Sequence, residues 1–295
     1  RDANAQSSHE GDDDEEEEEE EDLPARAKRG WPPKTWKPKH PRGTKLTSHD
    51  IARANTTVLE ATRSILESRT GSLYTIHLMS MQFYLGDDSI FIGQTVANTM
   101  TTQKVASVEF TIMTKVRKKI TNNGLRTYGR QFMSFFDSCP NTFGGLARLT
   151  LENLRLGESD FPKIFSICKQ LEVLCLYHCD MGIDSLLEVE HPQLSELVIA
   201  CSRLIKRVDL KWVPKLTVLK FNGFLSRDDP FSLGYVPQLQ TVSITNVGLS
   251  WHKMLKLSEL LGKTAIRASP AVRPPRMTKL GILGRAGASS APGDE

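Results

Sequence analysis

One short segment carries side chains that could bind a metal ion. Cys175, His178 and Cys179 lie close together, with Tyr177 between them, and they offer the sulfur and nitrogen donors that hold zinc in many proteins. If the segment is a strand, its side chains alternate between two faces, and this alternation separates the two cysteines. Structural roles are therefore favoured over a metal site, and no cofactor is expected.

A catalytic centre finds little support in the sequence. It contains no phosphate-binding glycine loop, no G-x-S-x-G turn and no H-E-x-x-H helix. His77 and His252 lie far apart in the sequence, with no evident nucleophile or carboxylate beside them. The five cysteines are an odd number without a signal-peptide pattern, which favours free thiols in a reducing compartment. We expect a protein that is not an enzyme and that resides in the cytoplasm or the nucleus.

The elements that position these side chains form a repeat. A block of the form L-x-x-L-x-L, or a close aliphatic or aromatic variant, occurs five times at separations of 25, 23, 22 and 23 residues. The blocks begin at Leu146, Leu171, Leu194, Leu216 and Leu239. A period in the twenties with this block is typical of a leucine-rich repeat, in which a strand and a return segment form one coil of a solenoid.

The first, fourth and sixth positions of each block are expected to point into a shared interior, because side chains alternate along a strand. The inward sets are Leu146/Leu149/Leu151, Leu171/Leu174/Leu176, Leu194/Leu197/Ile199, Leu216/Leu219/Phe221 and Leu239/Val242/Ile244. No coil can bury such a set alone, so stacking of neighbouring coils stabilises the fold.

Prolines support the same register. Pro192, Pro214 and Pro237 each stand two residues before a block leucine, where the returning segment must end. Cys179 falls at a turn position where such repeats often carry Cys or Asn, which again favours a structural role.

Weaker blocks upstream extend the repeat to about seven coils. They are Leu73/Ile76/Leu78 and Val105/Val108/Phe110. Helices are expected after each block, the first starting near Asp87 or Asp88 and the second carrying apolar residues at helical spacing. The inward residues of these helices are Ile92, Val96 and Met100, then Leu125, Tyr128, Phe132, Phe135, Phe136 and Cys139.

The sequence divides into four parts. Residues 46–71 are expected to form an N-terminal capping helix with a capping box at Thr47 and Asp50 and a stop at Gly71. Residues 72–264 form the repeat domain, and they close with an apolar helix at 251–261. The composition of residues 1–45, acidic from Asp12 to Asp22 and then basic and proline-rich, predicts a disordered tail, as does that of 265–295. Because the chain starts at Arg1 without a methionine, we expect a piece of a longer product or an imperfectly predicted one.

Block positions five and seven point away from the interior and form the expected protein-binding, concave face. The fifth-position residues are His77, Glu109, Thr150, Cys175, Val198, Lys220 and Ser243, and the seventh-position residues are Met79, Thr111, Glu152, Tyr177, Ala200, Asn222 and Thr245. Tyr177 with Glu152 and Lys220 is the best candidate for an aromatic anchor flanked by charges. The alternative for each residue is an ordinary solvent-facing strand position.

Several segments resemble plant F-box/LRR proteins, particularly those of grasses. They are residues 149–154, 168–172, 193–197, 234–237 and 249–253. The resemblance covers roughly residues 50–264, the leucine-rich-repeat portion. An F-box would place a Leu-Pro pair before about forty residues of amphipathic helix, whereas a basic, proline-broken stretch follows Leu23 and Pro24, so no F-box is visible.

The resemblance implies the substrate-binding part of an F-box/LRR subunit of an SCF-type ubiquitin ligase. It would bind a target protein, and it would meet the adaptor subunit of the ligase if an F-box exists outside this chain. A scaffold or competitor that binds the same targets without delivering them is the first alternative. A chromatin or nucleic-acid-associated protein that uses the charged tails is the second, and its binding would weaken with salt. No membrane partner is expected.

Overall fold

The computed structural model describes most of the repeat region. The described residues are 46–68, 75–115, 120–182, 185–200, 205–222, 225–226, 231–245, 248–249 and 279–283. They all belong to the second of two units into which the chain divides, Arg1–Lys45 and Leu46–Glu295. The predictions for residues 1–45, for Gly71 and for the helix at 251–261 lie outside the described residues.

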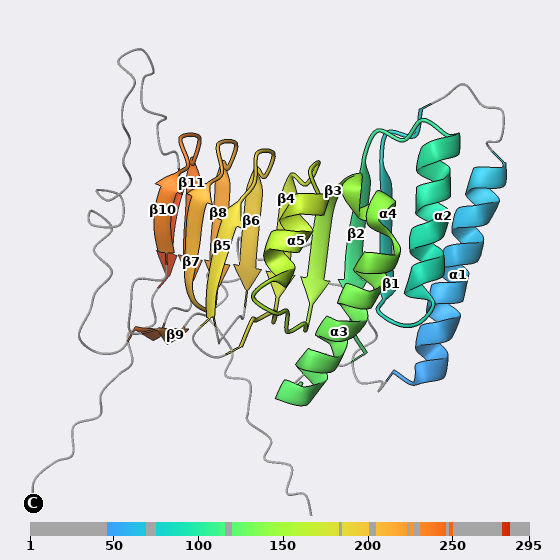
Figure 1. The fold of residues 1–295 in the computed structure, drawn as a ribbon, viewed down its shortest axis with the longest axis horizontal. Helices are drawn as coiled ribbons and strands as arrows, with labels where there is room; N and C mark the ends of the chain where they lie inside the picture. Colours follow the sequence, from blue (N-terminus) through green and yellow to red (C-terminus); the bar gives the residue numbers. More distant parts are fainter. Residues whose placement is uncertain are drawn as a thin grey trace, which may run out of the picture. The chain divides into compact units, whose positions relative to one another are not determined.

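Helices and strands alternate in the first half of the described chain (Figure 1). The elements are α1 (Ser48–Glu67), β1 (Met79–Tyr84), α2 (Ser89–Thr102), β2 (Val108–Met113), α3 (Asn122–Ser138), α4 (Pro140–Gly144), β3 (Leu146–Glu152), α5 (Asp160–Ile167) and β4 (Val173–Tyr177). Each return from one strand to the next therefore contains a helix.

Strands dominate the second half. They are β5 (Ser185–Glu190), β6 (Glu196–Ala200), β7 (Ile205–Trp212), β8 (Val218–Asn222), β9 (Leu225–Ser226), β10 (Phe231–Tyr235), β11 (Thr241–Thr245), β12 (Gly248–Leu249) and β13 (Lys279–Leu283). In β5, the buried Leu187 and Val189 alternate with the exposed Leu186, Glu188 and Glu190, the period-two pattern of a strand with one buried face. This pattern explains why the return segments become extended here.

Two sheets organise these elements. The larger sheet has eight strands in the order β1-β2-β3-β4-β6-β8-β11-β13, and every neighbouring pair is parallel. The return strands form a parallel three-stranded sheet in the order β10-β7-β5. The fold is therefore an α/β leucine-rich-repeat solenoid, as predicted.

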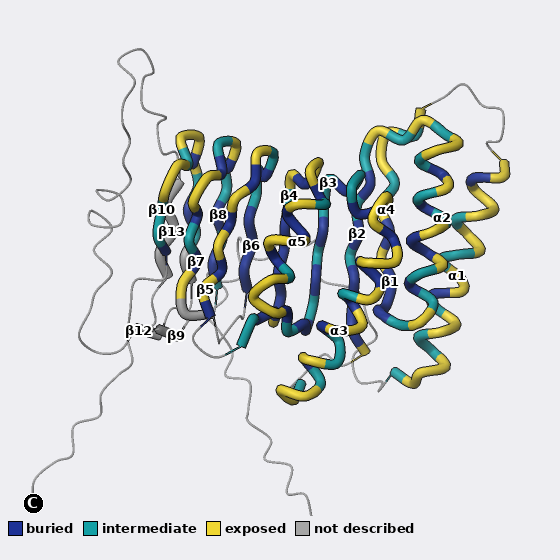
Figure 2. Tube along the Cα trace, in the orientation of Figure 1, coloured by how far each residue is buried: buried dark blue, intermediate teal, exposed yellow. Residues whose placement is uncertain are grey.

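The core lies between the large sheet and the return segments. The predicted inward leucines from Leu146 to Leu216 are buried, and buried positions recur along the strands in Figure 2. Helices α3 and α4 add a cluster of phenylalanines in which the rings of Phe136 and Phe143 lie 4.6 Å apart and those of Phe110 and Phe143 lie 6.0 Å apart. Stacked apolar side chains from successive coils thus share one interior.

Helix α1 begins with the predicted capping box. The backbone N–H of Asp50 donates to the Thr47 hydroxyl at 3.1 Å, and the backbone N–H of Thr47 donates to the Asp50 carboxylate at 2.9 Å. The hydrogen bond from Thr47 holds the pKa of the Asp50 carboxyl below its usual range. The helix ends at Glu67, with Ser68 as its C-cap, and α1 packs against β1 and α2.

The predicted register of the first two blocks is wrong. Met81 lies opposite Phe110, and Phe110 lies opposite Leu149, so the fourth positions are Met81 and Phe110 rather than Ile76 and Val108. Leu78, predicted to be buried, is 53% exposed. Several apolar residues in alternation allow more than one register, and only pairing with the neighbouring strand decides between them.

The prediction of a tail without regular structure is wrong for Lys279–Leu283. These residues form β13, which pairs in parallel with β11 from Thr241↔Lys279 to Thr245↔Leu283. Their sequence, Lys-Leu-Gly-Ile-Leu, is too short to show a repeat period, and it becomes a strand through hydrogen bonds to a sheet edge already in place.

His191 is a buried histidine just before Pro192. Its Nδ1 accepts the backbone N–H groups of Gln193 at 3.2 Å and Leu194 at 3.1 Å, and its Nε2 lies 3.0 Å from the carbonyl oxygen of Cys168. Because Nδ1 faces two donors, the neutral ring with its proton on Nε2 fits this site. Burial lowers the pKa of His191 below its ordinary value of 6.5, against the opposing effect of the Cys168 carbonyl.

This histidine is expected to make the fold less stable in mild acid. Below pH about 6.5 the unfolded chain binds a proton on the ring, whereas the folded chain binds it only at a lower pH, so stability falls as the pH falls through that window. His191→Asn keeps a side-chain acceptor but does not titrate. Between pH about 7.5 and about 5.5, the melting temperature of the wild type should fall more than that of the variant. Equal falls would contradict this assignment.

Candidate functional site

The face of the large sheet that points away from the core is here called the outer face. It carries three rows of side chains, at block positions three, five and seven. The row at block position three is Ser80, Glu109, Arg148, Val173, Glu196, Val218 and Thr241. The row at position five is Gln82, Thr111, Thr150, Cys175, Val198, Lys220 and Ser243. Because the strands are parallel and in register, neighbouring members of a row lie about 4.7–4.9 Å apart.

Most of the predicted site residues fall into these rows as expected. Thr150, Cys175, Lys220 and Ser243 share the fifth-position row, and Glu152, Tyr177, Asn222 and Thr245 share the seventh-position row. The register correction changes two residues. Glu109 belongs to the third-position row, opposite Arg148, and its place in the fifth is taken by Thr111.

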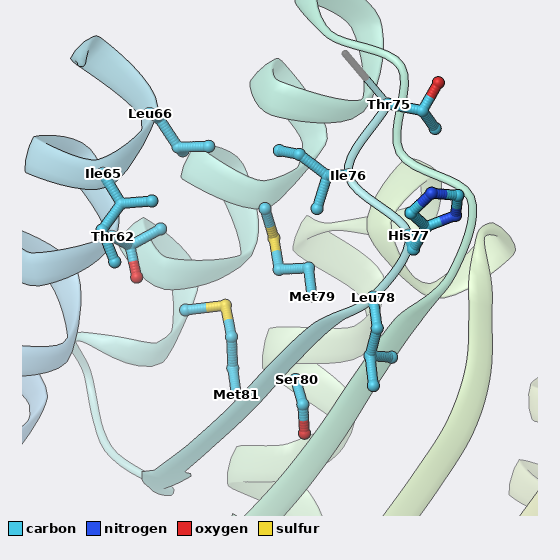
Figure 3. A pocket seen from close by; sticks show the side chains of 10 residues that line it. All are labelled: Thr62, Ile65, Leu66, Thr75, Ile76, His77, Leu78, Met79, Ser80 and Met81. Carbon is cyan, nitrogen blue, oxygen red and sulfur yellow. The ribbon is translucent and has the colours of Figure 1, made fainter. Parts of the chain in front are cut away.

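His77 does not lie on the outer face, where it was predicted. It precedes β1 and lines a pocket beside α1 together with Thr62, Leu78 and others (Figure 3). Gln82 occupies the place in the fifth-position row that was assigned to His77.

Charged pairs between neighbouring strands occupy the middle of the outer face. Arg148 Nε lies 3.3 Å from the Glu109 carboxylate, and Lys220 Nζ lies 2.6 Å from the Glu196 carboxylate. Arg148 is 38% exposed and the other three side chains are 23–25% exposed. The two pairs present both signs of charge on a rigid sheet, an arrangement suited to a partner with complementary charges.

Between these two ion pairs, the outer face is formed by largely apolar side chains with little exposed surface, here called the floor. Cys175 and Tyr177 are 6% and 5% exposed, and Val198 and Ala200 beside them on β6 are buried as well. Burial raises the pKa of both Tyr177 and Cys175, so the phenol and the thiol stay protonated at neutral pH. Tyr177, predicted as an aromatic anchor flanked by charges, thus lies in the floor with little of its side chain exposed.

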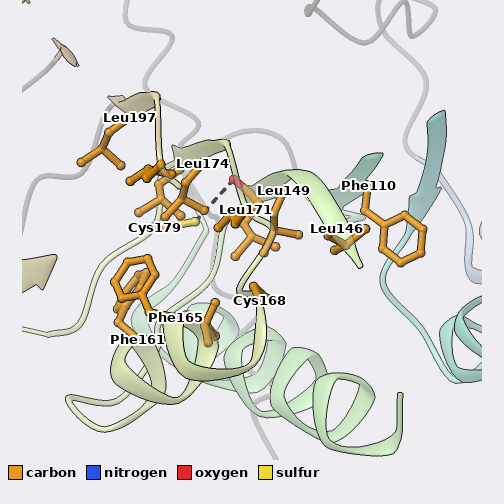
Figure 4. Close-up of a cluster of buried hydrophobic side chains, with 14 of the residues drawn as sticks. Phe110, Leu146, Leu149, Phe161, Phe165, Cys168, Leu171, Leu174, Cys179 and Leu197 are labelled. Carbon is orange, nitrogen blue, oxygen red and sulfur yellow. Dashed lines mark hydrogen bonds between the residues drawn. The ribbon is translucent and has the colours of Figure 1, made fainter. Parts of the chain in front are cut away.

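Cys175 and Cys179, for which structural roles were favoured over a metal site, have separate environments. Cys179 is fully buried, and its Sγ lies 3.5 Å from the carbonyl oxygen of Leu151 in the preceding coil, the contact drawn in Figure 4. Burial raises its pKa to about 12. Cys175 is on the outer face. In the part of the chain that is described, no group of three His, Cys, Asp or Glu side chains is placed to hold a metal ion.

Two charged residues of this face were not predicted. Arg148 and Glu196 occupy block position three, which was not predicted to lie on the surface. A signal was available, because position three holds a charged residue in both Leu146–Leu151 and Leu194–Ile199. Such a residue beside an inward leucine indicates an outward side chain.

The stacked parallel strands, the aliphatic triplets and the outer rows define a leucine-rich-repeat protein. The family model for the LRR repeats of FBD-associated F-box protein At5g56370 matches residues 121–289, more than half of the chain. The chain belongs to this family. No curated protein and no protein of known structure was found to match it. None of the described helices combines the length and apolar character needed to cross a lipid bilayer.

Proposed function

We propose that this chain recognises a target protein through its outer face, as the substrate-binding part of an SCF-type ubiquitin ligase. The observation that carries the proposal is the pair of inter-strand ion pairs, Glu109–Arg148 and Glu196–Lys220, on either side of the floor at Tyr177. The F-box protein named in the family description supports the ligase context. We further propose that the chain is not an enzyme and acts in the cytoplasm or nucleus.

Charge complementarity is the proposed basis of recognition. Backbone hydrogen bonds hold β2, β3, β6 and β8 in register, so the charges do not have to be ordered when a partner arrives. A partner surface with alternating acidic and basic residues would match them. Such pairing mainly selects the partner and speeds association.

The three-stranded sheet of return strands, which is not part of the outer face, offers a matched control for a test of this surface. Lys211 of β7 pairs with Glu188 of β5 at 2.7 Å, as Arg148 pairs with Glu109 on the outer face. Arg148→Glu should weaken recovery of proximity-labelled partners from cells about tenfold or more, whereas Lys211→Glu should not. Both variants should first be shown to melt like the wild type. If Arg148→Glu recovered the same partners as the wild type, the outer face would not be the recognition surface.

The ligase role requires contact with the adaptor subunit. A pull-down with purified adaptor can compare residues 1–295 with a version extended by the upstream genomic sequence. Binding of the adaptor by either form would support a role as a subunit of the ligase. If neither form binds and the outer-face partners are still recovered, the chain is a scaffold or competitor for the same targets.

A further inference from the structure

Strand β1 is the first strand of the eight-stranded sheet, so one of its edges has no neighbouring strand among the described residues. The backbone N–H of Met79 donates to Ser107 and that of Leu85 donates to Met113. Odd-numbered residues of the strand therefore face β2. The N–H and C=O groups of Ser80 and Gln82 point to the other side, where no described backbone group pairs with them.

A side chain already occupies the far end of this edge. The amide nitrogen of Asn55 donates to the carbonyl oxygen of Tyr84 at 2.9 Å, and the amide oxygen of Asn55 accepts the N–H of Tyr84 at 3.0 Å. Asn55 thereby supplies the donor and the acceptor that a neighbouring strand would supply. Ser80 and Gln82 offer the same pair of groups at the next outward positions of the strand.

Beside Ser80, the space between α1 and the strand is open. A pocket of about 490 Å³ is lined on one side by Thr62, Ile65 and Leu66 of α1, and on the other by residues 75–81. Figure 3 shows these α1 side chains across from Met79 and Met81. Ile65 is 58% exposed, so its side chain is accessible to an apolar side chain that enters the pocket.

We propose that this edge binds an extended peptide of a partner protein, which adds as a strand beside Ser80 and Gln82 and places apolar side chains at alternate positions in the pocket. The backbone groups specify an extended main chain, and alternate residues of an added strand would point toward Ile65 and Met79. Because α1 stands beside the edge, the space fits one strand better than the edge of a second sheet. This site is separate from the outer-face ion pairs and does not depend on the proposed function.

A defined peptide pair tests the backbone part of the proposal. The probe is a short fluorescein-labelled peptide in which valine alternates with threonine, and its control carries N-methyl groups on the alternate amides that would face β1. Fluorescence polarisation with the full chain should show saturable binding of the probe. Binding of the N-methylated peptide should be at least tenfold weaker, because it cannot donate hydrogen bonds to the edge.

Variants of the chain test the site itself. Ser80→Pro removes an outward-facing N–H at a position where an edge strand can hold proline, and Ile65→Glu places a charge in the pocket. Both should weaken binding of the probe about tenfold or more. Phe91→Glu is the matched control, because Phe91 is similarly exposed, at 55%, and does not line the pocket. Should Ser80→Pro fail to fold, Ile65→Glu and the N-methylated peptide still decide the outcome.

Three results would overturn the proposal. One is equal binding of the plain and N-methylated peptides, and another is no saturable binding of the plain peptide. The third is a dimer in sedimentation that Ser80→Pro converts to monomer without any effect of the peptide, since this would assign the edge to a second copy of the chain.

Discussion

Replacing Asp180 by alanine is expected to lower the free energy of unfolding by about 3–5 kcal/mol. Arg155 Nη2 donates to Asp180 at 3.0 Å and Arg155 Nε makes a second hydrogen bond to the same carboxylate, and the two side chains are only 9% and 7% exposed. Without Asp180, the buried guanidinium keeps the Asn122 amide oxygen at 3.1 Å but loses its counter-charge. Urea unfolding would measure the loss.

An exposed pair provides the comparison. Asp137 and Lys163 lie 2.6 Å apart with side chains 50% and 46% exposed, so Asp137→Ala should cost only about 0–1 kcal/mol. The double variant Arg155→Met with Asp180→Leu should recover much of the loss, because it removes both buried charges. A cost for Asp180→Ala no larger than that for Asp137→Ala would show that the buried pair is not holding the two coils together.

The second large effect is expected in the middle of the stack, where Leu197→Ala should cost about 2–5 kcal/mol. Leu197 has no exposed surface and lies between Leu174 and Leu219 on the neighbouring strands. Its removal leaves a cavity that the hydrogen-bonded strands on both sides cannot close by moving together. Chemical denaturation of the purified variant would measure the effect.

Leu186 is the matched leucine. It lies on β5 but is 36% exposed, so Leu186→Ala should cost less than about 1 kcal/mol. If Leu197→Ala cost as little as Leu186→Ala, the leucine triplets would not form a shared interior, and the register assigned to the repeats would be wrong.

The regular repeats could be read from the sequence because each is held by the same local rule. A leucine at the first, fourth and sixth positions, with a proline before three of the blocks, leaves a single register in which every apolar side chain is buried. The observed pairing of Leu149, Leu174, Leu197 and Leu219 follows this register. The same rule placed Lys220 and Thr150 on the outer face.

The buried ion pair of Arg155 and Asp180 lies outside the pattern of apolar residues that defines the repeats. Both residues stand nine positions after the first leucine of their units, Leu146 and Leu171. Opposite charges at equivalent positions of successive repeats are adjacent once the coils stack, so the spacing held a usable signal. Their burial, however, depends on the packing around them, which no local pattern specifies.

By itself, the sequence determined the solenoid class, the stacked triplets from Leu146 onward and the capping box of α1, because each depends on residues within one unit or on one constant spacing. Only the tertiary structure decided the register of β1 and β2, the strand at Lys279–Leu283, and the positions of Glu109 and His77. Hydrogen bonding to a neighbouring strand selects among alternatives that are equally apolar, and that selection is a property of two segments together.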